Sequence, residues 1–171
     1  MAYFDSNGCY EYQSIGPAFL RYDPAVDRWV RLPFPWSTIG GPYAGGVIGG
    51  KLYMMGGAWP EGKGVLAAYD PATNKWTPKN ALGLARWGTA TAVLGSKLYV
   101  IGGTRYNAEL GVLETLDKTR VYDPTTNLWG TRASLPSPRA DISGTIVRVN
   151  GQARIEVIGG MAPGNNLQYV P

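Results

Sequence analysis

Arginine and aromatic side chains are the residues of this sequence whose types and spacing best suit ligand recognition. Arg86 and Arg139 stand at equivalent places in two similar stretches, each just before a strand-like run. A guanidinium can hold a carboxylate through two parallel hydrogen bonds, which makes arginine well suited to a binding site. The alternative is structural, because arginines here could pair with a neighbouring Asp or bond loop carbonyls. Trp87 could stack on a ligand or fill a gap between packed sheets.

Further candidates lie in stretches that are typical of loops. Trp59 lies in one such stretch, and Arg105 and Tyr106 lie in another, each following a strand-like run. Tyr43 lies near the place that corresponds to Trp87. Loops on a fixed scaffold often carry binding residues, and Trp, Tyr and Arg are common anchors of a partner. These side chains either anchor a ligand or cover loop backbone, and the sequence leaves both interpretations open.

The composition excludes several kinds of chemistry. The chain has no His and one Cys, Cys9, so it lacks Ser-His-Asp and Cys-His catalysis, His-ligated metals and intrachain disulfides. No calcium-binding spacing is present, and we predict no metal and no cofactor. The net charge is +4 without a basic run, which predicts no nucleic-acid partner. Because neither a spanning apolar run nor a signal peptide is visible, we expect no membrane contact and a cytoplasmic location.

A repeat of about 50 residues organises the whole chain. A Tyr-Asp-Pro triplet recurs three times with a Trp six residues after the Asp, and a diglycine that ends a strand-like run recurs in phase. Asp and Pro favour a turn, the Trp starts the next strand, and the glycines permit a sharp turn or a close backbone approach. We therefore assign structural roles to the repeated residues. They are Asp23, Asp70, Asp123, Trp29, Trp76, Trp129, Gly56, Gly57, Gly102, Gly103, Gly159 and Gly160.

Each repeat predicts two hairpins, which together make a four-stranded antiparallel sheet. We expect one domain over 1–171 with full units at 39–84 and 85–137, a partial or atypical unit at 1–38 and an incomplete unit at 138–171. Residues 104–118 form the longest insertion and are expected to be a solvated loop. With 24 Gly and 13 Pro in 171 residues, the chain is predicted to be all-β.

In its diglycines, Tyr-Asp-Pro triplets and spaced tryptophans, the chain resembles the kelch-repeat family of β-propellers. Arg86 and Arg139 match the arginine that the family places before the innermost strand, whereas Gly40 departs from it. The resemblance implies an arc of three to four blades, and known propellers have about 4–8. An open arc would expose apolar blade faces, so we expect a second copy to complete the ring as a homodimer. A four-bladed monomer and a fragment of a longer kelch protein are the alternatives.

The resemblance also implies a function. It favours a non-enzymatic module that binds a protein or peptide, with Arg86 and Arg139 gripping acidic groups at the channel mouth. Propellers of the sialic-acid mutarotase or epimerase type are the alternative, since acid–base catalysis by Glu and Arg needs no His. Copper oxidases of the galactose-oxidase type need His and are excluded. Whether the chain is an enzyme stays open, with the binding module preferred.

Overall fold

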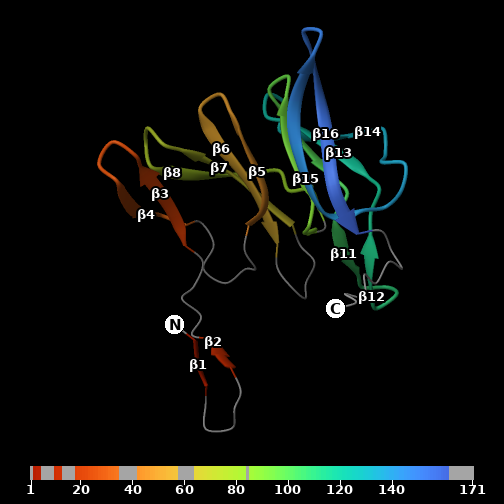
Figure 1. Cartoon of the computed structure of the whole chain (residues 1–171), viewed down its shortest axis with the longest axis horizontal. Coiled ribbons are helices and arrows are strands. Elements are labelled where there is room, and N and C mark those ends of the chain that lie inside the picture. The colour runs from red at the N-terminus through yellow and green to blue at the C-terminus, as the bar shows by residue number, and fades with distance from the viewer. Residues whose placement is uncertain are drawn as a thin grey trace, which may run out of the picture. The chain divides into compact units, whose positions relative to one another are not determined.

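The computed structural model describes residues 2–4, 10–12, 18–34, 42–57, 64–83 and 85–161. Within these ranges all the regular elements are β-strands and no helix occurs, which confirms the all-β class (Figure 1). It follows that no described helix could cross a membrane. The chain divides into two compact units, Met1–Thr38 and Ile39–Pro171.

The first unit contains two hairpins. Strands β1 (Ala2–Phe4) and β2 (Tyr10–Tyr12) form one, and β3 (Phe19–Asp23) and β4 (Arg28–Leu32) form the other. The second hairpin turns through the Tyr-Asp-Pro motif, and it places Tyr22 directly opposite Trp29.

The second unit contains two four-stranded antiparallel sheets and one long hairpin. The first sheet has the order β5 (Pro42–Ile48), β6 (Lys51–Gly57), β7 (Gly64–Asp70) and β8 (Lys75–Lys79). The second repeats that order with β9 (Ala90–Leu94), β10 (Lys97–Ile101), β13 (Thr119–Asp123) and β14 (Leu128–Arg132). Strands β15 (Ala140–Val149) and β16 (Gln152–Met161) form the hairpin. The repeat predicts a third strand of the incomplete unit at 166–170, and these residues lie outside the described part of the chain.

The sheets stack face to face like successive blades. Strand β5 packs against β9, and β9 packs against β15, so the first strands of consecutive repeats are neighbours. Between the two sheets lies a core that includes Tyr53, Met55, Leu98, Val100 and Tyr122. A second core joins the second sheet to the β15–β16 hairpin through Ala90, Ile101 and Ile142. Alternate residues of each strand therefore face one neighbour or the other, as in a propeller.

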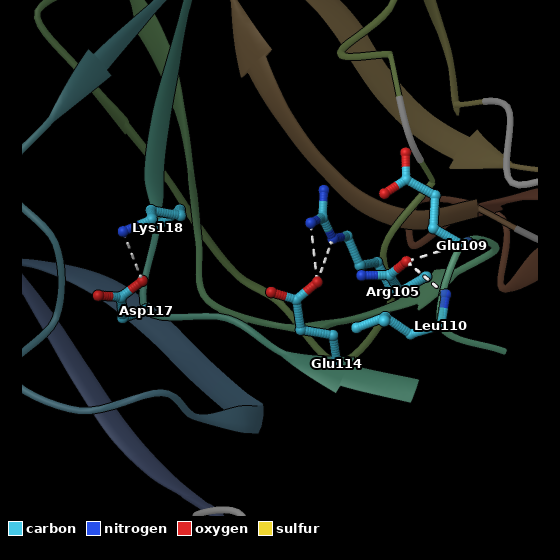
Figure 2. A network of polar contacts seen from close by, with 7 residues as sticks. Arg105, Glu109, Leu110, Glu114, Asp117 and Lys118 are labelled. Carbon is cyan, nitrogen blue, oxygen red and sulfur yellow. Dashed lines mark hydrogen bonds and ion pairs between the residues drawn. The ribbon is translucent and has the colours of Figure 1, made fainter. Parts of the chain in front are cut away.

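The prediction that residues 104–118 form a solvated loop is wrong. This segment forms a two-stranded hairpin of β11 (Thr104–Asn107) and β12 (Val112–Thr115). Its turn is stabilised by the Asn107 side chain, whose Oδ1 accepts the backbone N–H groups of Glu109 and Leu110 at 3.1 and 3.2 Å (Figure 2). Gly111 then adopts a positive φ of 67°, which a glycine allows at little cost.

The three Tyr-Asp-Pro turns share one local geometry. In each, the Asp carboxylate accepts the backbone N–H two residues later, at 2.9–3.0 Å. The Tyr hydroxyl donates to a side chain five residues later that has a positive φ, namely Asp27, Asn74 or Asn127. In the two complete sheets the Asp also forms an ion pair with the lysine that starts the second strand. These ion pairs are Lys51–Asp70 at 2.9 Å and Lys97–Asp123 at 2.6 Å.

Candidate functional site: an arginine-rich pocket

A pocket of about 400 Å³ opens beside the β11–β12 hairpin in the second unit. Four cationic side chains and one carboxylate line it together with two uncharged residues. The lining residues are Arg86, Arg105, Glu114, Leu116, Lys118, Arg120 and Thr131. We call this cavity the arginine pocket.

Three segments of the repeat bring these side chains together. Arg105 and Glu114 stand opposite each other on β11 and β12. Arg120 stands opposite Thr131 on β13 and β14. Arg86 comes from the segment that leads into β9, where the neighbouring Trp87 and Thr104 exchange two backbone hydrogen bonds of 3.0 and 2.8 Å. The hairpin is therefore fixed to the base of the blade, and its charged residues are held over the pocket.

The diglycine Gly102–Gly103 joins these segments. Both residues have positive φ, 62° and 90°. Gly103 N–H donates to Arg139 O at 2.8 Å, and Gly103 O accepts Leu116 N–H at 2.8 Å. A Cβ on Gly102 would lie 2.5 Å from Arg139 O, so only a glycine fits where the next repeat approaches.

The charges in the pocket are not balanced. Glu114 accepts from Arg105 Nε at 2.8 Å and from Nη2 at 2.7 Å, both through Oε2 (Figure 2). Lys118 forms an ion pair of 3.1 Å with Asp117, and Asp117 does not line the cavity. Among the described residues neither Arg86 nor Arg120 has a carboxylate partner. The cavity therefore carries an excess of positive charge.

Two guanidinium groups also have a buried Nε–H with no acceptor among the described residues. Arg86 is only 8% exposed, and its side chain makes a long hydrogen bond of 3.5 Å from Nη1 to Gly102 O. The Nε atoms of Arg86 and Arg120 are buried and unpartnered. Burial lowers the pKa of Arg86 to about 10, with smaller contributions from Arg120 and Arg105, so it stays cationic at neutral pH. Because buried unpaired donors are costly, an anion in the pocket would satisfy what the chain leaves open.

The structure separates the sequence-predicted candidates into different places. Arg86 and Arg105 line the arginine pocket. Arg139 does not, because its side chain is exposed and its main chain binds Leu116 and Gly103. Trp87 and Tyr106 are half-buried and lie outside the lining set. Trp59 and the side chain of Tyr43 lie outside the described residues.

Sequence reasoning missed Arg120 and Lys118 as pocket residues. The repeat gives no sign of Arg120, because Leu20 and Ala67 stand at its place in the other units. A usable signal was the Lys118-x-Arg120 alternation, which puts two cations on one face of a strand. The described residues hold no cluster of three metal-ligating side chains.

Comparison with known proteins gives matches along the repeats. The family described as Kelch motif matches residues 41–83 and 85–136. Kelch-like protein 26 from Danio rerio is 32% identical over 82% of this chain, and Kelch-like protein 21 from Homo sapiens is 32% identical over 68%. The chain spans 22% and 18% of those two proteins. The solved structure of YjhT aligns over 72% of this chain and 35% of its own, with a TM-score of 0.52 and 25% identity.

Proposed function

Because the chain belongs to the kelch-repeat family, we propose that it is a β-propeller module that binds a protein or peptide through an acidic group held in the arginine pocket. The observation that carries this proposal is the pair of buried, unpartnered Nε atoms on Arg86 and Arg120. A carboxylate oxygen is the acceptor that such groups bind best. Arg105 is already paired with Glu114, so we assign it to the rim of the site.

Peptide arrays test this proposal directly. We expect peptides that contain Glu or Asp to bind, and the same peptides with Gln or Asn to bind at least about tenfold more weakly. Arg86→Gln and Arg120→Gln should each weaken binding by a similar factor without lowering the melting temperature. The matched control is Arg148→Gln, which removes an exposed arginine outside the pocket. Acidic peptides that bind both pocket variants as tightly as the wild type would overturn the proposal.

Self-association into a closed ring is part of the same proposal. Its support is the apolar surface on the described strands, with Leu20, Trp29 and Ile158 all more than half exposed. Large apolar side chains left exposed on strands favour burial against another surface. We expect a mass in solution near twice 18.4 kDa by sedimentation.

A second candidate function is the processing of an anionic sugar. One carboxylate, Glu114, converges with arginines on a cavity whose volume suits a saccharide, and Glu can exchange protons with a sugar hydroxyl. If this function holds, the protein should accelerate anomer exchange of an acidic sugar in NMR saturation-transfer experiments. Glu114→Gln should then abolish the acceleration. A panel of acidic and neutral sugars without acceleration would exclude this candidate.

A further inference from the structure

Strand β12 has one edge that no strand covers in the described part of the chain, because it pairs with β11 alone. The bond from Leu116 N–H to Gly103 O makes these two residues a hydrogen-bonded pair of that ladder. Such pairs alternate along an antiparallel ladder, so the main-chain groups of Leu113 and Thr115 point away from β11. Thr104, opposite Thr115, agrees with this alternation, since its main chain bonds on the far side of β11. The outer edge of β12 therefore presents the N–H and C=O groups of Leu113 and Thr115.

This edge carries none of the features that usually prevent a strand from pairing further. Edge strands in natural proteins are often blocked by a lysine, a proline or a β-bulge. Strand β12 reads Val-Leu-Glu-Thr and pairs with β11 in an unbroken register. Its first two side chains, Val112 and Leu113, are 48% and 58% exposed. The edge is therefore suited to an extended segment that adds to it as a further strand.

The arginine pocket lies on one face of this strand. Four alternate residues line it in succession, namely Glu114, Leu116, Lys118 and Arg120. Side chains that alternate in this way share a face, whereas Leu113 lies on the other face. A segment that ran beside β12 would place every second side chain on the pocket face. The excess of positive charge there, and the buried Nε atoms of Arg86 and Arg120, favour an acidic side chain in that segment.

We propose that an acidic partner peptide adds to the outer edge of β12 as an antiparallel third strand of the β11–β12 hairpin. This inference rests on the peptide-binding function proposed above and defines the conformation in which the peptide is bound. Its main chain exchanges hydrogen bonds with Leu113 and Thr115, and one acidic side chain enters the arginine pocket. The main-chain bonds provide affinity for any extended peptide, and the pocket selects the acidic ones.

The register predicts the order of residues in the peptide. An acidic residue directly opposite Glu114 would be repelled, so the acidic residue stands opposite Leu116. Because the peptide runs antiparallel to β12, the residue two positions later stands opposite Glu114 and is uncharged or basic. The residue three positions later stands opposite Leu113, on the other face, and is apolar. The ligand motif is therefore an acidic residue followed, three positions later, by an apolar one.

Methylation of single main-chain nitrogens in a four-residue motif peptide tests the added strand. The second and fourth residues stand opposite Thr115 and Leu113, so methylation of either removes a donor that faces β12. Each should weaken binding at least about tenfold in calorimetric titration. Methylation of the first or third residue, whose N–H faces away, should change the affinity less than about twofold. Any other pattern among the four peptides would overturn the added strand.

The variant Leu113→Pro tests the same edge from the side of the protein. It removes an N–H that points away from β11, and proline is accepted in edge strands at such positions. We expect motif peptides to bind at least about tenfold more weakly while the melting temperature stays unchanged. The matched control is Leu113→Ala, which keeps the N–H and should weaken binding only about threefold through the lost apolar contact. Equal losses in the two variants would overturn the added strand, and the methylated peptides decide the question if Leu113→Pro does not fold.

Amide hydrogen exchange, followed by NMR on the full chain, separates this inference from the proposed function. The amides of Leu113 and Thr115 should exchange fast in the free protein and slowly with a motif peptide bound, whereas Glu114, bonded within the hairpin, is the internal control. Slow exchange of all three without peptide would show that another segment or a second copy already covers the edge, and would overturn the inference. Acidic peptides that bind without protecting Leu113 and Thr115 would refute the added strand and leave the peptide-binding function intact. Acidic peptides that fail to bind at all would refute both.

Discussion

The first and third copies of the Tyr-Asp-Pro motif have the same internal geometry in opposite surroundings. The rings of Tyr22 and Trp29 are 5.2 Å apart at 42°, and those of Tyr122 and Trp129 are 5.2 Å apart at 49°. Each Tyr hydroxyl donates at 2.7 Å to a side chain five residues later. Yet Tyr122 has no exposed surface, whereas Tyr22 is 43% exposed. The motif's shape is therefore set locally, while its burial depends on a neighbouring blade.

The diglycines show the same contrast at the other end of the repeats. Gly102 and Gly159 are equivalent, with φ of 62° and 82°. A Cβ on Gly102 would meet atoms of Arg139 and Ile142 from the next repeat and of Leu135 from the end of its own, whereas a Cβ on Gly159 would meet no described atom within 4 Å. The backbone conformation of each glycine is therefore set within its own repeat, whereas the close packing around Gly102 depends on the neighbouring repeat.

The largest expected effect compares the two tyrosines. Tyr122→Ala should lower the free energy of unfolding by about 3–5 kcal/mol, because it empties space inside a packed core. Tyr22→Ala should cost less than about 1 kcal/mol in dilute protein, where its ring stays exposed. Both substitutions remove the same hydroxyl bond and the same Trp contact, so the difference isolates burial. Urea unfolding followed by circular dichroism gives both values, and equal losses would show that burial does not distinguish the two copies.

The two glycines should differ by a smaller amount. Gly102→Ala should cost about 3 kcal/mol, from left-handed strain and from contact with the backbone of the next repeat. Gly159→Ala should cost about 1 kcal/mol, since strain alone opposes it. Thermal unfolding in dilute solution measures both. If the two losses match, the next repeat does not crowd Gly102.

The smallest expected effect is on the loss of folding stability at low pH. The hydrogen bond from Lys97, with those from Thr125, holds the pKa of Asp123 well below its usual range. A depressed pKa in the folded state stabilises the protein above the ordinary aspartate pKa of about 3.9, and this stabilisation is lost as the pH falls further. Asp123→Asn should therefore flatten the fall of the urea midpoint below about pH 4. Asp23→Asn is the control, because Asp23 forms no ion pair in the described part of the chain. An identical flattening by both would refute the role of Lys97.

The repeat allowed most strands of the two complete sheets to be predicted to within two residues. The repeat predicts strands at 51–55 and 97–101, because a diglycine marks the end of each run and a turn precedes it, and these strands correspond to β6 and β10. Local turn chemistry and alternating apolar residues carry that information in the sequence.

The arginine pocket was only partly predictable. Arg86 stands out because Arg139 repeats it, but Arg120 has no arginine counterpart in the other units. Its position in the pocket also depends on the β11–β12 hairpin, which lies in the longest insertion of the repeat and was expected to be a loop. A site that forms where an irregular insertion folds back onto a regular blade is set by non-local contacts, which periodicity does not reveal.

The closed base of the β11–β12 hairpin has a consequence for engineering. Paired main-chain bonds between Trp87 and Thr104, and the bond from Leu116 to Gly103, hold both ends of the hairpin to the blade. The tip over 108–111 is exposed and takes no part in these bonds. Exposed tips of this kind tolerate insertion, so foreign peptide sequences grafted there should be displayed next to the pocket while the blade remains intact.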